Sequence, residues 1–108
     1  MSKRESELYL QDILDSITKV EEFIKDFTFE QFENDEKTTE AVIRKLEIIG
    51  EAAKNLPEEA RDKYPNVPWG KMIGMRNKIL HEYFGVDTET VWKTITEDLP
   101  MLKKSLKF

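Results

Sequence analysis

Apolar residues recur at spacings of three and four along most of the chain, and this period constrains the fold more than any other feature. Such stripes cover about residues 6–27, 39–56, 69–84 and 87–107. A residue repeated every third or fourth position lines one face of an α-helix, whereas a half-buried strand alternates at every second position. Four glycines and four prolines are also too few for a turn-rich all-β chain. The sequence therefore predicts an all-α fold.

The breaks between these stripes predict how the helices are joined. Residues 28–36 lack a long apolar period, so we expect a connection there, with a short helical turn around residues 29–32. Either Thr38 or Thr39 can cap the helix that follows, because a threonine hydroxyl accepts a hydrogen bond from a free N–H of the first turn.

The prolines predict the remaining breaks. Pro57 suits the first position of a short helix over residues 57–64. Residues 65–69 contain two prolines and are expected to form an extended connector, which Trp69 anchors to the core. Pro100 lies inside the last helix and should kink or interrupt it, because proline lacks the N–H that the helix needs.

Three glycines lie inside the expected helices. Gly50 costs the second long helix about 1 kcal/mol relative to alanine, and a glycine in such a place often marks the close approach of another helix. Gly70 and Gly74 are four residues apart, so they share one face. That face could receive another helix, either from within the chain or from a second copy.

The length sets the number of domains. The chain has 108 residues, which is enough for one small domain and too few for two. We expect a single domain over residues 1–108, built as an up-and-down bundle of four main helices plus a short one.

The charge is unevenly distributed. The net charge of −5 argues against extensive binding of nucleic acid. Residues 61–80, however, hold five basic residues and one acid, so this window carries +4 and the rest of the chain −9. A local basic surface could contact a few phosphates or an acidic partner protein. Lys71 and Lys78 in this window are the candidate RNA contacts.

Several classes of protein are excluded or disfavoured. The chain has no cysteine, which excludes disulfides, thiolate catalysis and cysteine-based zinc sites. No apolar run approaches the roughly 20 residues that span a bilayer, and the N-terminal residues have no apolar signal core. We therefore expect a cytoplasmic protein without membrane association.

The residues with the most chemical potential lie in the stretch Arg76–Tyr83. It contains His81, the only histidine of the chain. Because each helical residue advances about 100°, Arg76 and Tyr83 share a face, and Asn77 and His81 can touch on the adjoining face. Arg76 and His81 are about 140° apart. Both reach one atom only if the arginine bends round, the helix distorts or a neighbouring molecule closes the gap.

A structural interpretation of this stretch stands beside the functional one. A histidine near a helix end is favoured by the helix dipole, Arg76 could pair with an acid, and Tyr83 could be a core aromatic. One histidine without carboxylates at ligand spacing is a poor metal site. The chain also lacks a nucleophile elbow and a glycine-rich phosphate loop.

RNA cleavage by attack of the ribose 2′-hydroxyl is the chemistry that these residues favour. His81 can accept a proton near neutral pH. Arg76 can stabilise the pentacovalent phosphate with its planar fork of donors. One histidine cannot conveniently be base and acid together, whereas a two-fold dimer brings two. The residues thus favour a site shared by two copies, and no metal or cofactor is expected.

Residues 76–87 resemble the signature of the HepT-like toxins, within the HEPN superfamily of helical-bundle ribonucleases. That signature is an arginine, four residues, a histidine, any residue and a tyrosine, and the chain matches it in full. Leu80 is a small departure, since many members carry a smaller residue there. Other segments resemble the family in the same order along nearly the whole chain, namely residues 41–56, 67–69, 73–75 and 98–100.

The resemblance implies a dimeric, metal-independent endoribonuclease with Arg76 and His81 as its catalytic pair and Asn77 in support. It also implies a cognate nucleotidyltransferase antitoxin that adds AMP to Tyr83, as in type VII-like toxin–antitoxin pairs. A bulky anion at that position would block the cleft and offset the charge of Arg76. The implied partners are RNA, a second copy of the chain and the antitoxin, with no DNA expected.

An alternative function belongs to a different class. The chain could be a non-catalytic helical module that binds a nucleotide or the nucleotidyltransferase itself. The acidic net charge slightly favours this alternative, while the complete Arg–His–Tyr pattern favours the enzyme.

Overall fold

The computed structural model describes residues 2–81 and 87–106, and it describes Leu80 and His81 by their backbone alone. Every regular element of these residues is helical, which confirms the predicted all-α class. None of the described helices is long and apolar enough to cross a membrane. In chain order the elements are α1 (Lys3–Phe23), α2 (Phe29–Glu33), α3 (Glu36–Asn55), α4 (Glu58–Arg61), α5 (Trp69–His81), α6 (Thr88–Lys93), the π-helix η2 (Thr94–Asp98) and α7 (Leu99–Ser105).

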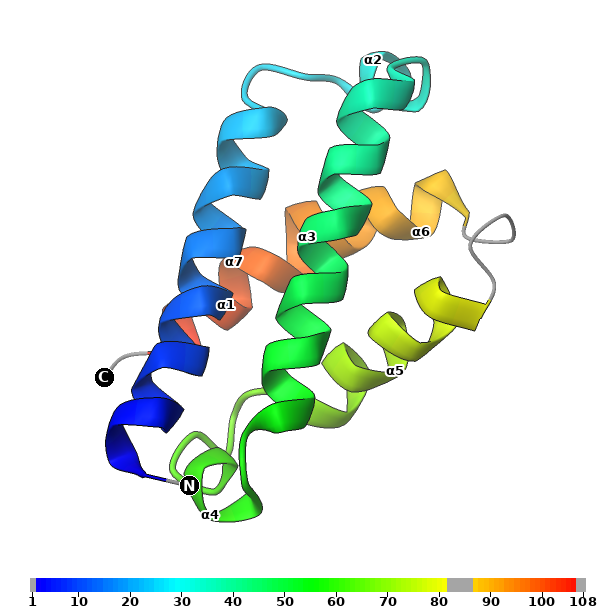
Figure 1. The fold of residues 1–108 in the computed structure, drawn as a ribbon. Helices are drawn as coiled ribbons and strands as arrows, with labels where there is room; N and C mark the ends of the chain where they lie inside the picture. Colours follow the sequence, from blue (N-terminus) through cyan, green and yellow to red (C-terminus); the bar gives the residue numbers. More distant parts are fainter. Residues whose placement is uncertain (1, 82–86, 107–108) are drawn as a thin grey trace.

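The long helices form a bundle around α3. α1 and α3 lie side by side and run in opposite directions, with α2 at the turn between them (Figure 1). α5 packs chiefly against α3. The segment formed by α6, η2 and α7 crosses behind α3 and reaches α1 (Figure 1). α3 is therefore the support on which the helix of the Arg–His motif rests.

The apolar stripes of the sequence form the core. Phe32 of α2 is fully buried, and its ring centroid lies 5.1 Å from that of Trp92 in α6. Such aromatic pairs stabilise a core through both area and geometry. The other fully buried large side chains come from four different parts of the chain, and they are Ile13, Ile17, Val20, Val42, Leu56, Ile79 and Val91.

α1 begins and ends earlier than the predicted range 6–27. Ser2 caps its start, because its hydroxyl accepts a hydrogen bond from the N–H of Glu5 at 3.1 Å. The helix ends at Phe23, and Asp26 adopts a positive φ of 63° that a helix cannot contain. Phe27 still packs against the core from outside the helix, which explains why its spacing resembled a continuation.

The predicted caps of α3 are wrong. Asp35 caps the helix, since its carboxylate accepts from the N–H of Thr38 at 3.0 Å. This hydrogen bond holds the pKa of Asp35 below its usual value, because it stabilises the charged form. Thr39 lies in the first turn, where its hydroxyl donates to the carbonyl of Phe32 at 2.9 Å. The helical turn expected before α3 is confirmed as α2.

The connection between α3 and α5 follows the prediction in outline. α4 is shorter than the predicted residues 57–64, and Pro57 is its cap rather than its first helical residue. Trp69 anchors the connector as expected. Its indole N–H points to the carbonyls of Arg61 and Tyr64 at 3.1 and 3.2 Å. These bonds fix the point where α5 begins.

Pro100 interrupts the last helix in the form of a π-helix. The N–H of Leu99 donates to the carbonyl of Thr94, five residues earlier. Proline has no N–H to offer and its ring clashes with the carbonyl four residues before it, so a wider turn ahead of it relieves the conflict. The predicted interruption is confirmed, and residues 88–105 are divided into α6, η2 and α7.

Candidate active site

α5, the helix that carries Arg76 and His81, packs closely against α3 at Gly50. A Cβ atom on Gly50 would overlap the Cβ of Arg76 and lie 2.9 Å from the carbonyl oxygen of Met72. Only glycine allows α3 and α5 this approach, so the predicted close contact is confirmed and its partner is the Arg76 turn. The approach also fixes the stem of the arginine against α3.

The glycine pair of α5 behaves differently. A Cβ on Gly70 or Gly74 would meet no atom of the described chain within 4 Å. Both residues are exposed. Of the two alternatives, packing within the chain is not observed among the described residues, and the approach of a second copy stays a prediction.

The guanidinium of Arg76 is held by two oxygen atoms. Its Nη2 lies 2.6 Å from Oε2 of Glu51 on α3, and its Nη1 donates to Oδ1 of Asn77 at 2.9 Å. The arginine side chain is only 17% exposed, whereas that of Glu51 is 50% exposed. Arg76 is thus a nearly buried cation with a fixed orientation. The structural interpretation of Arg76 expected it to pair with an acid, and that acid is Glu51.

Solvent reaches Arg76 through a groove across α1, α3 and α5, which we name the Arg76 groove. Its volume is about 330 Å³. Three carboxylates and two guanidinium groups line it, so the groove carries a small excess of negative charge. Its lining residues are Tyr9, Asp12, Arg44, Glu47, Ile48, Glu51, Ala52, Asn55 and Arg76.

The structure places His81 by its backbone, as the last residue of α5. Arg76 and His81 therefore lie on the same helix, five residues apart, as the motif predicts. Tyr83 lies outside the described residues, and so do Phe84 to Val86. Asn77 was expected to orient His81, and the contact that the structure shows for it is the one with Arg76.

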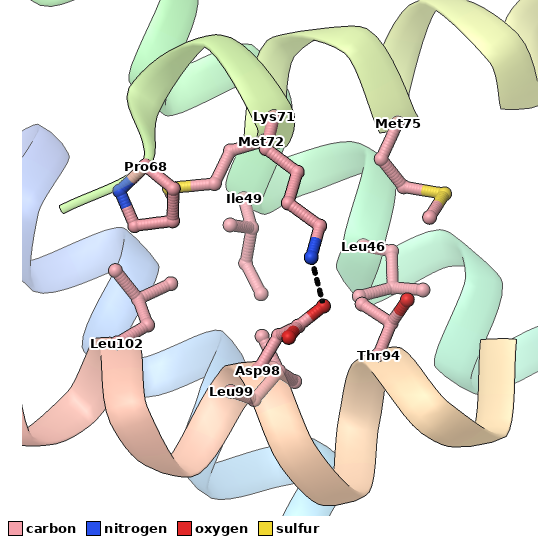
Figure 2. A pocket seen from close by; sticks show the side chains of 10 residues that line it. All are labelled: Leu46, Ile49, Pro68, Lys71, Met72, Met75, Thr94, Asp98, Leu99 and Leu102. Atoms are coloured by element: carbon pink, nitrogen blue, oxygen red, sulfur yellow. Dashed lines mark ion pairs between the residues drawn. The ribbon is translucent and has the colours of Figure 1, made fainter. Parts of the chain in front are cut away.

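The two candidate RNA contacts have different surroundings. Lys71 forms an ion pair with Asp98 of η2 at 2.9 Å, at the mouth of a small apolar pocket of about 40 Å³ (Figure 2). The π-helix carries this aspartate, so the lysine helps to join α5 to the C-terminal segment. Lys78 is exposed. It is the more available of the two for a phosphate.

Glu51 is a site residue that the sequence alone does not reveal. It lies 25 positions before Arg76 on another helix, and only the crossing of α3 with α5 brings the two together. The one available signal was its neighbour Gly50, since a residue next to a close helix crossing is turned about 100° from it and can reach the partner helix from the side. Among the described residues, no group of three or more histidine, aspartate or glutamate side chains could hold a metal ion.

A model of the Ribonuclease HepT-like family matches residues 13–108. The chain belongs to this family. It is 50% identical over 101 residues to "Probable ribonuclease HepT" of Thermococcus cleftensis, covering 94% of this chain and 92% of that protein. It is 47% identical over 107 residues to "Putative RNase MJ1380" of Methanocaldococcus jannaschii, covering 99% and 98%. No solved structure matches the chain.

Membership in the HepT-like family confirms the resemblance found in the sequence. The match includes all of α3 and α5, and so it includes Gly50, Glu51, Arg76 and His81. Relatives of nearly the same length are named ribonucleases. Ribonuclease chemistry is thus the context in which the fixed arginine and the single histidine are to be understood.

Proposed function

We propose that this HepT-like chain is a metal-independent endoribonuclease toxin of a type VII-like toxin–antitoxin system. The observation that carries the proposal is the fixed guanidinium of Arg76, five residues before the only histidine of the chain. An arginine that is packed, oriented and open to a groove is suited to binding a phosphate whose charge increases during reaction. The ribonuclease names of its relatives support the same chemistry.

In the proposed reaction His81 accepts the proton of a ribose 2′-hydroxyl, and the freed oxygen attacks the adjacent phosphorus. The bond from phosphorus to the 5′ oxygen breaks, and that oxygen takes a proton from the partner subunit's His81. The products are a 2′,3′-cyclic phosphate and a 5′-hydroxyl. Arg76 donates hydrogen bonds to the non-bridging oxygens as negative charge builds on them.

The proposed active form is a two-fold dimer. A single chain supplies one histidine, whereas the reaction needs a base and an acid at the same time. An isologous interface would bring two α5 helices together. The open space over Gly70 and Gly74 leaves room for the second α5. On this face Gly74 lies about 160° from Arg76, at about 100° per residue, so the arginine would have to reach the shared phosphate around its own helix. Lys78 and Lys71 are the proposed additional RNA contacts.

The proposed chemistry is tested with the wild-type protein on tRNA or mRNA in the presence of EDTA. Cleavage should persist with EDTA and leave 2′,3′-cyclic phosphate ends, because the attacking group belongs to the RNA. A substrate with 2′-deoxyribose at the cut position should resist. RNA that is bound and never cut would favour a non-catalytic binding module instead. Sedimentation of the same sample gives the mass of the active species.

Modification of Tyr83 is the proposed means of neutralisation. When the chain is co-expressed with the proposed nucleotidyltransferase antitoxin, we expect a mass increase of AMP and loss of RNA cleavage. Tyr83→Phe should show no adduct, since phenylalanine lacks the acceptor oxygen. Tyr9→Phe is the matched control, because Tyr9 lines the Arg76 groove and its loss should leave the adduct in place. Intact-mass spectrometry measures both, and an adduct on Tyr83→Phe contradicts the assignment.

A further inference from the structure

Glu51 contacts Arg76, the proposed catalytic arginine, and the proposed function gives Glu51 no role. Its carboxylate lies 2.6 Å from the guanidinium of Arg76, yet half of its side chain is exposed to the Arg76 groove. A surface ion pair alone contributes little to stability. This pair is different because one partner is nearly buried and held at its stem by Gly50.

Three contacts together determine where the guanidinium of Arg76 points. The backbone of α3 at Gly50 packs directly against Cβ and Cγ of the arginine, so this stem has no room to shift towards α3. Glu51 then holds one terminal nitrogen and Asn77 the other. An arginine has five N–H donors in a rigid plane, and these two partners need only two of them. The remaining donors keep a fixed direction from which a phosphate can be bound.

We propose that Glu51 is a positioning residue that orients Arg76 for the scissile phosphate, and that its negative charge also weakens the binding of RNA. This inference rests on the proposed ribonuclease function. Orientation raises kcat, because an already oriented group needs no reorganisation during the reaction. The carboxylate beside the phosphate raises KM, because like charges repel at short range.

The two effects of Glu51 give a kinetic signature that structural damage does not produce. Glu51→Ala should lower kcat about tenfold through lost orientation, and should lower KM about threefold through lost repulsion. A partly unfolded variant would also show a lower apparent kcat, but its KM would not improve. Glu51→Gln keeps an acceptor oxygen for Arg76 and loses the charge. Its kcat should stay within about threefold of wild type, while its KM falls as in the alanine variant.

Glu47 provides a matched control on the same helix. It lines the same groove one turn before Glu51, and it pairs with Arg44 at 3.4 Å rather than with Arg76. Glu47→Ala removes the same charge without releasing Arg76, so its kcat should equal that of wild type. An unchanged kcat in Glu51→Ala overturns the inference. So does a kcat that falls equally in Glu51→Ala and Glu51→Gln, or equally in Glu47→Ala.

Nitrogen NMR of the arginine side chains tests the orientation without any cleavage. Wild type should show separate Nη resonances for Arg76, because Glu51 and Asn77 hinder rotation of its guanidinium. In Glu51→Ala these resonances should merge, and in Glu51→Gln they should stay separate. Free rotation in the wild type overturns the inference and removes one support of the ribonuclease proposal, which the cleavage assay then decides separately. If the wild type holds Arg76 rigidly and never cleaves RNA, the proposed function fails and this role of Glu51 fails with it.

Discussion

Alanine at Arg76 is expected to lower kcat/KM for RNA cleavage by about a thousandfold, the loss typical of a donor that stabilises transition-state charge. His81→Ala should cost about a hundredfold to ten-thousandfold, as removal of a general acid or base does. Both losses should appear in single-turnover cleavage of the same RNA by purified protein. Each variant should retain the helical circular dichroism of the wild type.

Two further variants separate the geometry of Arg76 from its charge. Arg76→Lys keeps the charge but lacks the planar fork that reaches Glu51 and Asn77 together, so it should still lose about a hundredfold. Arg44→Ala is the matched control, because this exposed arginine lines the same groove and pairs with Glu47 instead. It should remain close to wild type. An Arg76→Ala protein that keeps more than about one tenth of the activity contradicts the proposed role.

A second large effect, on stability, is expected when Gly50 of α3 is replaced by alanine. Gly50→Ala should lower the free energy of unfolding by about 1–3 kcal/mol, because the new Cβ overlaps the Arg76 turn and forces α5 outward. The loss should appear even though alanine is favoured over glycine within a helix by about 1 kcal/mol. Urea denaturation measures the stability. Cleavage activity should fall as well, since the arginine moves with its helix.

Gly74→Ala is the control for this substitution, because it makes the same change on the facing helix where the described chain leaves open space. In dilute protein, where the chain is monomeric, it should raise the free energy of unfolding by up to about 1 kcal/mol through helix propensity alone. A Gly50→Ala protein as stable as this control under the same conditions would contradict the close-contact argument. At concentrations where the proposed dimer forms, Gly74→Ala should become destabilising, because its Cβ would enter the interface between the two α5 helices.

Patterns in the sequence predicted those features of the fold that depend only on residues close together in the chain. The apolar stripe that includes Ile13, Ile17 and Val20 marked the buried face of α1 correctly, because helical spacing alone decides which side chains share a face. Helix ends were less predictable. Ser2 and Asp35 act as caps because their side-chain oxygens accept a hydrogen bond from a free N–H of the first turn. Several nearby polar residues could do the same, so the sequence alone does not select the cap. Pro100 predicted an interruption of the last helix, but not that it takes the form of a π-helix over Thr94–Asp98.

The candidate site shows the same division. Arg76, Asn77 and His81 were found from the sequence because they lie within six residues of one another on one helix. Glu51 was not found, since its link to Arg76 depends on how two helices cross. Gly50 indicated that another helix approaches α3 closely, but not which helix this is. The ion pair of Lys71 with Asp98 was likewise unpredictable, because η2 carries the aspartate to α5 only in the folded chain.

The reliance of α5 on α3 has a mechanical consequence. Because the arginine, its backing glycine and both of its oxygen partners belong to these two helices, their mutual distances can survive motions elsewhere in the bundle. Opening of α1 or of the C-terminal segment would leave the charged group and its holders travelling as one body. The orientation of the guanidinium would thus be preserved while the surrounding helices move.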